Sequence, residues 1–317
     1  MKILLASPID PATTEILQAR HDVEQADPAE LHSAVADAEI VILRSGPVLS
    51  AEVLNGAPRL RLVVRAGSGL DNIDVDAARA RGIAVVRIAG MSAAPVAELT
   101  FALLLSLARK VTLADRLIRV GRWPKQQLSG PLIRGRTLGV VGAGNIGGLV
   151  GQMGYAWGMH VLGCVARPDA TLGEQLAQRG ITLTDFDEIL ERADFVTLHV
   201  PLCDTTRHLV DAEVLDRMRE GSLLVNMARG GVVEEKALRE ALIEGRTVAG
   251  AALDVHETEG EGTISPLAAL PNVVLTPHIG AMAADTQQRI GARVLELVEA
   301  YRDGRLEQEL DHGELVV

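Results

Sequence analysis

Short apolar runs alternate with amphipathic segments along almost the whole chain. Most of these runs are continuously apolar, which is typical of strands buried on both faces of a parallel sheet. Amphipathic segments such as Ala212–Glu220 and Glu235–Gly245 predict helices between them. Strands that alternate with helices predict an α/β fold with parallel sheets and crossover connections. The predicted strands are Ile3–Ala6, Ile40–Arg44, Leu62–Arg65, Ala84–Ile88, Leu138–Val141, His160–Cys164, Phe195–His199, Leu223–Ala228, Gly250–Val255 and Val273–Thr276.

Residues 95–123 interrupt this alternation with one long helical pattern, from Pro95 to Trp123. Its first part is apolar on more than one face, and its second part is basic and amphipathic. The first part predicts a buried core helix. A surface this apolar could also pack against a second subunit, so we predict a homodimer joined through this helix. The final dozen residues carry little pattern, and we expect them to be loosely ordered.

The length of 317 residues is too great for one ordinary core and predicts two domains. Hydrophobic residues make up 48% of the chain and aromatic residues 2%, so aliphatic side chains must fill the cores. The net charge of −11 argues against nucleic acid or an anionic membrane as the main partner. The most apolar stretch, Phe101–Ala108, falls well short of the roughly 20 residues that a membrane span requires.

The chain has two cysteines, Cys164 and Cys203. They show no metal-ligand spacing and cannot form a disulfide framework, which favours a reducing compartment. The apolar run at the N-terminus is too short for a signal peptide. We therefore expect a cytoplasmic protein without a bound metal.

A glycine-rich turn follows the predicted strand RTLGVV and precedes a helical run. A bare GxGxxG pattern is common by chance and can be a turn without a ligand. The strand before it and the helix after it favour a dinucleotide site, with the pyrophosphate at the helix N-terminus. The residues of this turn that we expect to contact the dinucleotide are Gly142, Gly144, Asn145, Ile146 and Gly147.

The strand after this turn lacks the acid that usually binds the ribose hydroxyls of NAD. The expected position holds Val165, and Arg167 follows in the same turn. Arg167 could pair with the 2′-phosphate of NADP, so we predict that NADP(H) is favoured over NAD(H). Two alternatives remain: Arg167 points into solvent and either cofactor is used, or Asp169 reaches back past the rigid Pro168.

Three segments beyond the turn carry charged residues at strand ends: LLVNMARGGVVEEKAL, GAALDVHETEG and NVVLTPHIG. With these segments in this order, the chain resembles the D-isomer-specific 2-hydroxyacid dehydrogenases. Within them it is most similar to the branch of phosphoglycerate dehydrogenase and hydroxypyruvate or glyoxylate reductase. The resemblance extends over essentially the whole chain, from LRSGPVL and VVRAGSGLDNID through AELTFALLLSLAR to TPHIG. It implies an oxidoreductase that transfers a hydride between NAD(P)H and a small 2-oxo acid.

The resemblance implies a catalytic constellation of Arg229, Glu259 and His278. The chemistry of these side chains agrees: an imidazole can give a proton to the ketone oxygen near neutral pH. A neighbouring carboxylate would favour the protonated ring, and a guanidinium offers a planar fork for the substrate carboxylate. Each residue also has an ordinary surface role open to it. Family members commonly carry Phe where this chain has His256, so Glu257 is a rival for the place of Glu259.

Other site residues are implied by the resemblance alone. Asp254 resembles the residue that holds the nicotinamide carboxamide, and Val200 and Pro201 lie in the cofactor-contacting segment ADFVTLHVPL. In the N-terminal part, the backbone N–H groups after Arg65 would cradle the substrate carboxylate. The residues expected to bind substrate are Arg44, Arg65, Ser68 and Gly69, the two arginines either facing a second acidic group or lying on the surface.

The family fold consists of two doubly wound parallel-sheet domains, a Rossmann dinucleotide domain inserted in a flavodoxin-like substrate domain. By this resemblance the substrate domain comprises residues 1–89 and 283–317, and the dinucleotide-binding domain residues 90–282. A second functional hypothesis stays open: a dinucleotide-sensing binding protein, because the related transcriptional corepressors retain the same three residues.

Overall fold

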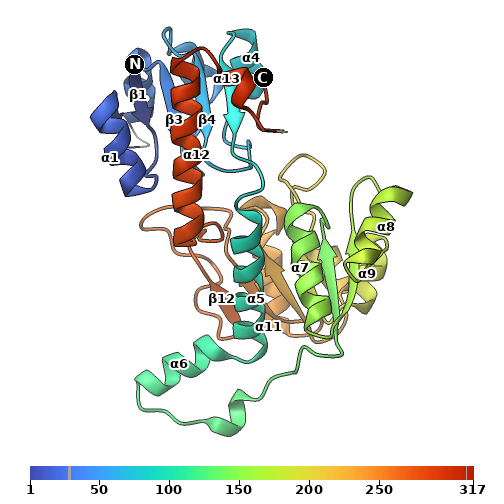
Figure 1. Cartoon of the computed structure of the whole chain (residues 1–317). Coiled ribbons are helices and arrows are strands. Elements are labelled where there is room, and N and C mark those ends of the chain that lie inside the picture. Colours follow the sequence, from blue (N-terminus) through green and yellow to red (C-terminus); the bar gives the residue numbers. More distant parts are fainter. Residues whose placement is uncertain (28–29, 312) are drawn as a thin grey trace. The chain divides into compact units, whose positions relative to one another are not determined.

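The computed structural model describes residues 1–27, 30–311 and 313–317 and divides the chain into two compact units. Unit 1 comprises Met1–Ser92 and Ala281–Val317, and unit 2 comprises Ala93–Gly280. In each unit helices cover both faces of a parallel sheet (Figure 1). The predicted fold class is therefore confirmed.

Unit 1, over its described residues, contains a five-stranded sheet in the order β2-β1-β3-β4-β5. All its neighbouring strands are parallel. Its strands are β1 (Lys2–Leu5), β2 (Asp22–Gln25), β3 (Ile40–Leu43), β4 (Leu62–Arg65) and β5 (Ala84–Arg87). Its helices are α1 (Pro11–Arg20), α2 (Leu31–Ala34), η2 (Val35–Asp37), α3 (Ala51–Asn55), α4 (Val75–Ala80), α12 (Ala284–Arg302) and α13 (Leu306–Glu309).

The long helix α12 returns the C-terminal part of the chain to unit 1. Figure 1 shows it in red along the face of the strands β3 and β4. Its apolar residues Val294 and Leu297 pack with Leu17 of α1 against that face, and both are fully buried. The opposite face is covered by α2, α3 and α4. Helix packing on both faces explains why these strands are continuously apolar in sequence.

Among the described residues after α13, Glu314, Val316 and Val317 are tied to unit 1, so the expectation of a loosely ordered tail is wrong for them. The backbone N–H of Val316 donates to Val85 O at 2.9 Å, and Val85 N–H donates to Val317 O at 3.1 Å. Glu314 is 3% exposed, and its carboxylate lies 2.6 Å from the guanidinium of Arg293. The tail was misjudged because its few apolar residues pair with an exposed sheet edge, which no periodicity within the tail reveals.

Unit 2 contains a seven-stranded sheet in the order β12-β11-β10-β9-β6-β7-β8, and the structure describes all of its residues. All neighbouring strands are parallel. Its strands are β6 (Thr137–Val141), β7 (His160–Cys164), β8 (Ile181–Leu183), β9 (Phe195–Leu198), β10 (Ser222–Asn226), β11 (Val248–Leu253) and β12 (Val273–Leu275). Its helices are α5 (Ala93–Ala108), α6 (Val111–Arg119), η3 (Lys125–Leu128), α7 (Asn145–Ala156), α8 (Ala170–Gln178), α9 (Phe186–Arg192), α10 (Ala212–Arg217), η4 (Gly230–Val232) and α11 (Glu235–Glu244).

The strand order of unit 2 reverses at β6. The chain proceeds outward from β6 through β7 to β8 and then returns to the other side of β6 with β9. In open parallel sheets, ligands bind beyond the carboxyl ends of the strands at such a switch point. The glycine-rich turn follows β6 directly, so the topology places it at this position.

The single helix predicted for residues 95–123 is wrong, because the structure has two helices, α5 and α6. The break falls at Lys110, which adopts a left-handed conformation with φ of 54° that an α-helix cannot contain. The chain returning from α6 crosses the end of α5 so closely that a Cβ on Gly130 would lie 1.9 Å from Ala108 O. Among the described residues, no helix has the length and apolarity needed to cross a membrane.

Candidate active site

The polar residues singled out in the sequence of unit 2 follow the carboxyl ends of its strands. Gly142 follows β6, His199 follows β9 and Asn226 ends β10, from which the turn to Arg229 leads. Asp254 follows β11, and the segment to His278 follows β12. Because the strands are parallel, these positions lie along one edge of the sheet. The structure therefore brings the predicted dinucleotide turn and the predicted acid–base residues to the same edge.

The glycine-rich turn has the geometry of an anion-binding site. Gly142 has a φ of +92°, and a Cβ there would lie 2.8 Å from the backbone of His199. A Cβ on Gly147 would lie 2.2 Å from Gly142 O, so only glycine lets α7 approach the strand this closely. A Cβ on Gly144 would meet nothing within 4 Å.

Helix α7 begins at Asn145, followed by Ile146, and no side chain caps its first N–H groups. Those groups and the helix dipole favour a negative charge. The open space above Gly144 is where a pyrophosphate would approach the backbone. The residues present therefore fit a dinucleotide.

The end of β7 has no acid directed to a ribose. Val165 is half-buried against the apolar core, and Arg167 is exposed. Asp169 caps α8, its Oδ1 accepting the N–H of Leu172 at 2.8 Å. Its engagement there disfavours the alternative in which Asp169 reaches back to the ribose.

Val200 and Pro201 follow β9 beside the glycine-rich turn. Cγ1 of Val200 lies 3.0 Å from the place that a Cβ on Gly142 would take, so the two segments are in contact. The carbonyl of Pro201 accepts the hydroxyl of Thr206 at 2.6 Å, which folds the following loop back on itself.

The side chains of His278 and Glu259 are in direct contact. Nδ1 of His278 lies 2.9 Å from Oε2 of Glu259, and since a carboxylate only accepts, Nδ1 carries the hydrogen. Nε2 is thereby left to exchange a proton with another molecule. The backbone of His278 is left-handed, with φ of 55°. Such a conformation persists only where the surroundings fix it.

Asp254 fixes that turn. It is 2% exposed, and its Oδ1 and Oδ2 accept the N–H groups of Ile279 and Gly280, both at 2.8 Å. Its carbonyl accepts the N–H of His278 at 2.7 Å. Thr276 also donates its hydroxyl to Oδ1 at 2.7 Å. Asp254 thus orients the histidine turn. The family resemblance, which assigned Asp254 to the nicotinamide carboxamide, did not suggest this role.

Arg229 follows a turn that its neighbour Asn226 stabilises. The buried Asn226 amide accepts the N–H of Ala228 at 3.0 Å and donates to Arg229 O at 3.1 Å. A Cβ on Gly230 would lie 1.8 Å from the carbonyl oxygen of His256. The arginine turn and the loop that carries Glu259 are therefore packed backbone to backbone.

Glu257 has a different partner from Glu259. Its Oε1 lies 2.8 Å from Nε2 of His208, on the loop after β9. The geometry favours Glu259 over Glu257 as the partner of His278.

The electrostatics of the site are dominated by Glu259 and His199. Burial raises the pKa of Glu259, but the hydrogen bond and charge of His278, with the N–H and charge of His256, outweigh it and leave the pKa lowered. Burial lowers the pKa of His199 to about 3. The ring of His199 is therefore neutral at physiological pH, beside the glycine-rich turn.

In unit 1 the residues expected to bind substrate lie after β3 and β4. Burial lowers the pKa of the Arg44 guanidinium, which lies 2.9 Å from Sδ of Met282. Arg65 is 6% exposed, and its guanidinium lies over Gly67, directly before Ser68 and Gly69.

Several residues that shape the candidate site in unit 1 and in unit 2 were not identified from the sequence. Arg87 pairs with Arg65 across the sheet and donates to Ser68 O at 3.4 Å. Arg87 could have been identified from the sequence, because it is an arginine at the end of a strand, as Arg65 is. His208, Glu235 and Asn226 gave no such signal, since their roles depend on loop contacts.

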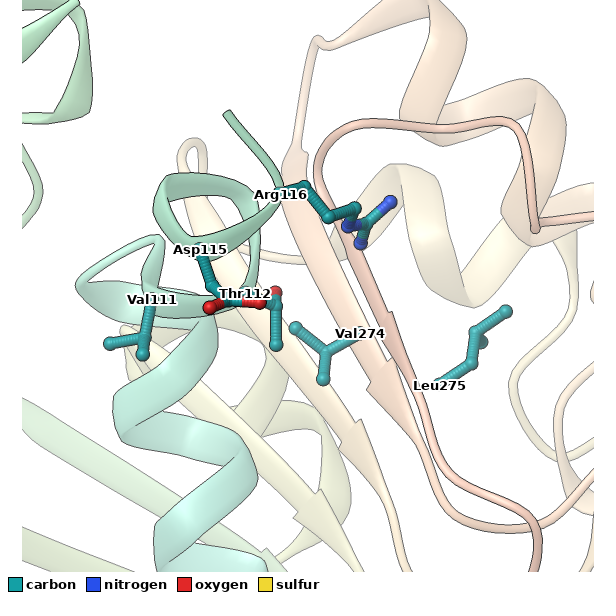
Figure 2. Close-up of a pocket in the computed structure, with 6 residues that line it drawn as sticks. All are labelled: Val111, Thr112, Asp115, Arg116, Val274 and Leu275. Atoms are coloured by element: carbon teal, nitrogen blue, oxygen red, sulfur yellow. The ribbon is translucent and has the colours of Figure 1, made fainter. Parts of the chain in front are cut away.

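A surface hollow of about 470 Å³ lies away from these residues, between α6 and the edge strand β12 (Figure 2). None of its lining residues belongs to the predicted site. They are Val111, Thr112, Asp115, Arg116, Val274 and Leu275.

Comparison with known proteins identifies relatives along the whole chain. Residues 101–280 match the family described as D-isomer specific 2-hydroxyacid dehydrogenase, NAD binding domain. A hydroxypyruvate reductase from Thermotoga maritima is 35% identical over 304 residues, covering 94% of this chain and 97% of that protein. The structure of a D-lactate dehydrogenase from Aquifex aeolicus, complexed with NAD and lactic acid, matches with a TM-score of 0.87 at 30% identity, covering 100% of this chain and 99% of that one.

A D-3-phosphoglycerate dehydrogenase from Methanocaldococcus jannaschii is 38% identical over 315 residues. The match covers 98% of this chain but 59% of that protein. The chain thus spans less than two thirds of the length of this relative.

Proposed function

Because the chain belongs to the D-isomer-specific 2-hydroxyacid dehydrogenase family, we propose that it interconverts a small 2-oxo acid and its D-2-hydroxy acid with a nicotinamide dinucleotide. The observation that carries this proposal is the 2.9 Å contact between His278 and Glu259 at the sheet edge that also bears the glycine-rich turn. An imidazole oriented by a carboxylate is the arrangement that general acid–base catalysis requires.

Each residue then has one task. His278 holds on Nε2 the proton that the ketone oxygen takes up, and Glu259 stabilises the charged ring by accepting from Nδ1. Arg229 binds the substrate carboxylate through its planar fork and polarises the ketone. The N–H groups at the start of α7 and Gly144 bind the pyrophosphate, and the nicotinamide supplies the hydride when it is bound.

The experiment that tests this proposal measures NADPH and NADH consumption with hydroxypyruvate, glyoxylate and 3-phosphohydroxypyruvate. Turnover with at least one of them, and formation of the D-hydroxy acid, are expected. Tight dinucleotide binding without turnover of any 2-oxo acid would contradict the proposal and favour the dinucleotide-sensing binding protein.

Within this proposal the preferred dinucleotide is NADP(H). Val165 can neither bind the ribose hydroxyls nor repel a 2′-phosphate, and Asp169 is occupied as a helix cap. The exposed Arg167 is free to reach a phosphate at the end of β7. Arg167→Ala should weaken kcat/KM with NADPH by about 1.5–3 kcal/mol and leave NADH nearly unchanged. A preference for NADH that Arg167→Ala does not alter would contradict this assignment.

Arg44 and Arg65 select a substrate with a second acidic group. Arg44 directly follows β3 and Arg65 ends β4, two adjacent parallel strands in an otherwise acidic chain. Arg65→Ala should reduce the preference for 3-phosphohydroxypyruvate over glyoxylate. An unchanged preference would leave hydroxypyruvate or glyoxylate, without a phosphate, as the substrate class.

The enzyme acts as a homodimer through α6 and the segment that follows it. Helix α6 has no buried residue, and Val111, Ile118 and Trp123 are 54%, 47% and 78% exposed. Contiguous exposed apolar patches mark protein–protein interaction sites, which supports an interface along this segment. A dimeric mass at micromolar concentration is expected, and Trp123→Glu should shift it toward the monomer.

The free thiols of Cys164 and Cys203 suit a cytoplasmic location.

A further inference from the structure

His256 lies in the loop that carries Glu259, three residues before it. Its backbone N–H donates to Oε1 of Glu259 at 3.1 Å. Its ring Nε2 lies 3.0 Å from the carbonyl oxygen of Thr276 and must therefore carry a hydrogen. The same carbonyl accepts the backbone N–H of His278 at 3.1 Å. His256 thus contacts Glu259 through its backbone N–H and, through its ring, the Thr276 carbonyl that also accepts from His278.

The second ring nitrogen of His256 faces a buried carboxylate. Nδ1 lies 3.8 Å from Oε1 of Glu235, which is 2% exposed at the start of α11. Glu235 also accepts the backbone N–H of Glu257 at 2.9 Å, so it anchors the loop that carries His256 and Glu259. A carboxylate buried to this degree requires a compensating partner. The ring of His256 therefore lies between the Thr276 carbonyl on one side and the Glu235 carboxylate on the other.

We propose that His256, backed by Glu235, is a positioning residue that joins Glu259 to His278. This inference rests on the proposed function, in which that pair delivers the proton. The loop carrying Glu259 has two attachments to the histidine turn: the contact between the acid and the imidazole, and the clamp from His256 to Thr276. The clamp keeps the acid in place when substrate binding or proton transfer weakens the first contact.

The other charged groups around His256 come from each neighbouring segment. Glu257 on its own loop pairs with His208 at 2.8 Å, and Arg229 lies next to Gly230, which packs against the His256 carbonyl. Glu235 on α11 faces Nδ1, and the backbone N–H of His256 contacts Glu259, the partner of His278. The acidic groups Glu235, Glu257 and Glu259 are thus matched in number by the basic groups His208, Arg229 and His278.

The test compares His256→Phe, which fills the space without a donor, with His256→Gln, whose amide can still donate to the Thr276 carbonyl. The matched control is His160→Phe, at an exposed histidine that begins β7. His256→Phe should lower kcat by about tenfold or more, because misplacing a catalytic group by about 1 Å can cost up to about a hundredfold. His256→Gln should restore most of kcat, and His160→Phe should match the wild type.

The pH profile separates positioning from packing. The charge of His256 is one cause of the lowered pKa of Glu259. Both His256 variants should therefore move the acid limb of kcat/KM to higher pH, although one of them keeps its kcat. Equal kcat losses in both variants, with an unmoved acid limb, would overturn the proposal and leave His256 as a packing residue. Wild-type behaviour of His256→Phe would also overturn it.

A spectroscopic readout does not depend on turnover. In protein labelled with ¹⁵N-histidine, the Nδ1 proton of His278 in its hydrogen bond to Glu259 should give a downfield signal. His256→Phe should broaden or abolish this signal, and His256→Gln should keep it. If no 2-oxo acid is reduced by the wild type, the proposed function fails, and the signal still decides whether His256 positions the pair. A signal unchanged in His256→Phe would overturn the positioning role.

Discussion

His199 should make unit 2 sensitive to acid. Both of its ring nitrogens are buried, and neither has a hydrogen-bond partner among the described residues. Burial lowers its pKa from 6.5 to about 3. Between these two values the unfolded chain binds a proton that the folded chain does not. Stability is therefore unaffected above pH 6.5 and falls progressively as the pH is lowered toward 3.

The magnitude follows from the linkage of protonation to folding. Each pH unit below 6.5 costs about 1.36 kcal/mol, so the loss from this one ring is about 2 kcal/mol at pH 5. His199→Asn removes the titrating ring. Whatever packing it costs is the same at both pH values, so the difference between pH 7 and pH 5 isolates the proton.

The assay is urea unfolding followed by tryptophan fluorescence. Trp123 and Trp157 both lie in unit 2, so the signal reports on the unit that contains His199. Between pH 7 and pH 5 the wild type should lose about 2 kcal/mol more than His199→Asn. His160→Asn, which removes an exposed ring from the same unit, should lose as much as the wild type. Equal losses in the wild type and His199→Asn would refute the reasoning.

Three further predictions concern the glycine-rich turn, the tail and the acid. Gly147→Ala places a Cβ 2.2 Å from Gly142 O. Calorimetry should therefore show dinucleotide binding weakened at least about tenfold, or by about 1.4 kcal/mol. Unchanged affinity would contradict the role of the turn in binding the dinucleotide. Glu314→Gln should destabilise unit 1 by about 1.5–3 kcal/mol in scanning calorimetry. Burial raises the pKa of Glu314, but its arginine partner outweighs this and leaves the pKa lowered. The difference in stability should therefore vanish as the pH falls through the lowered pKa. A pH-independent difference would argue against the pair. Glu259→Gln should slow reduction and remove the acid limb of the rate profile, since the lowered pKa keeps the carboxylate charged until low pH; the same effect from Glu257→Gln instead would show that the wrong acid was chosen.

Most strands were predictable because each is buried on both faces and therefore apolar throughout. The two strands that were missed, Asp22–Gln25 and Ile181–Leu183, lie at the sheet edges. The first is largely exposed and polar, and the second has three residues. Edge strands carry little burial signal, so pairing with a neighbour defines them more than their own sequence does.

The residues of the candidate site were also predictable only in part. The glycine-rich turn and the positions of Arg229 and His278 follow from motifs at strand ends, which the sheet topology then gathers. The resemblance favoured Glu259, but Glu257 stayed a rival, because both lie in one irregular loop and their partners come from other segments. The break at Lys110 was equally hidden, since a lysine with a positive φ has no signature of its own.

If His278 delivers the proton to the substrate, its removal should stop turnover without weakening dinucleotide binding. His278→Ala and the wild type are compared for turnover of the best 2-oxo acid and for dinucleotide affinity by calorimetry. Turnover should fall by at least about a hundredfold, the usual loss when a general acid is removed, while the dissociation constant stays unchanged. Dinucleotide binding that weakens in parallel with turnover would show that His278 is structural, and undiminished turnover would show that the proton comes from elsewhere.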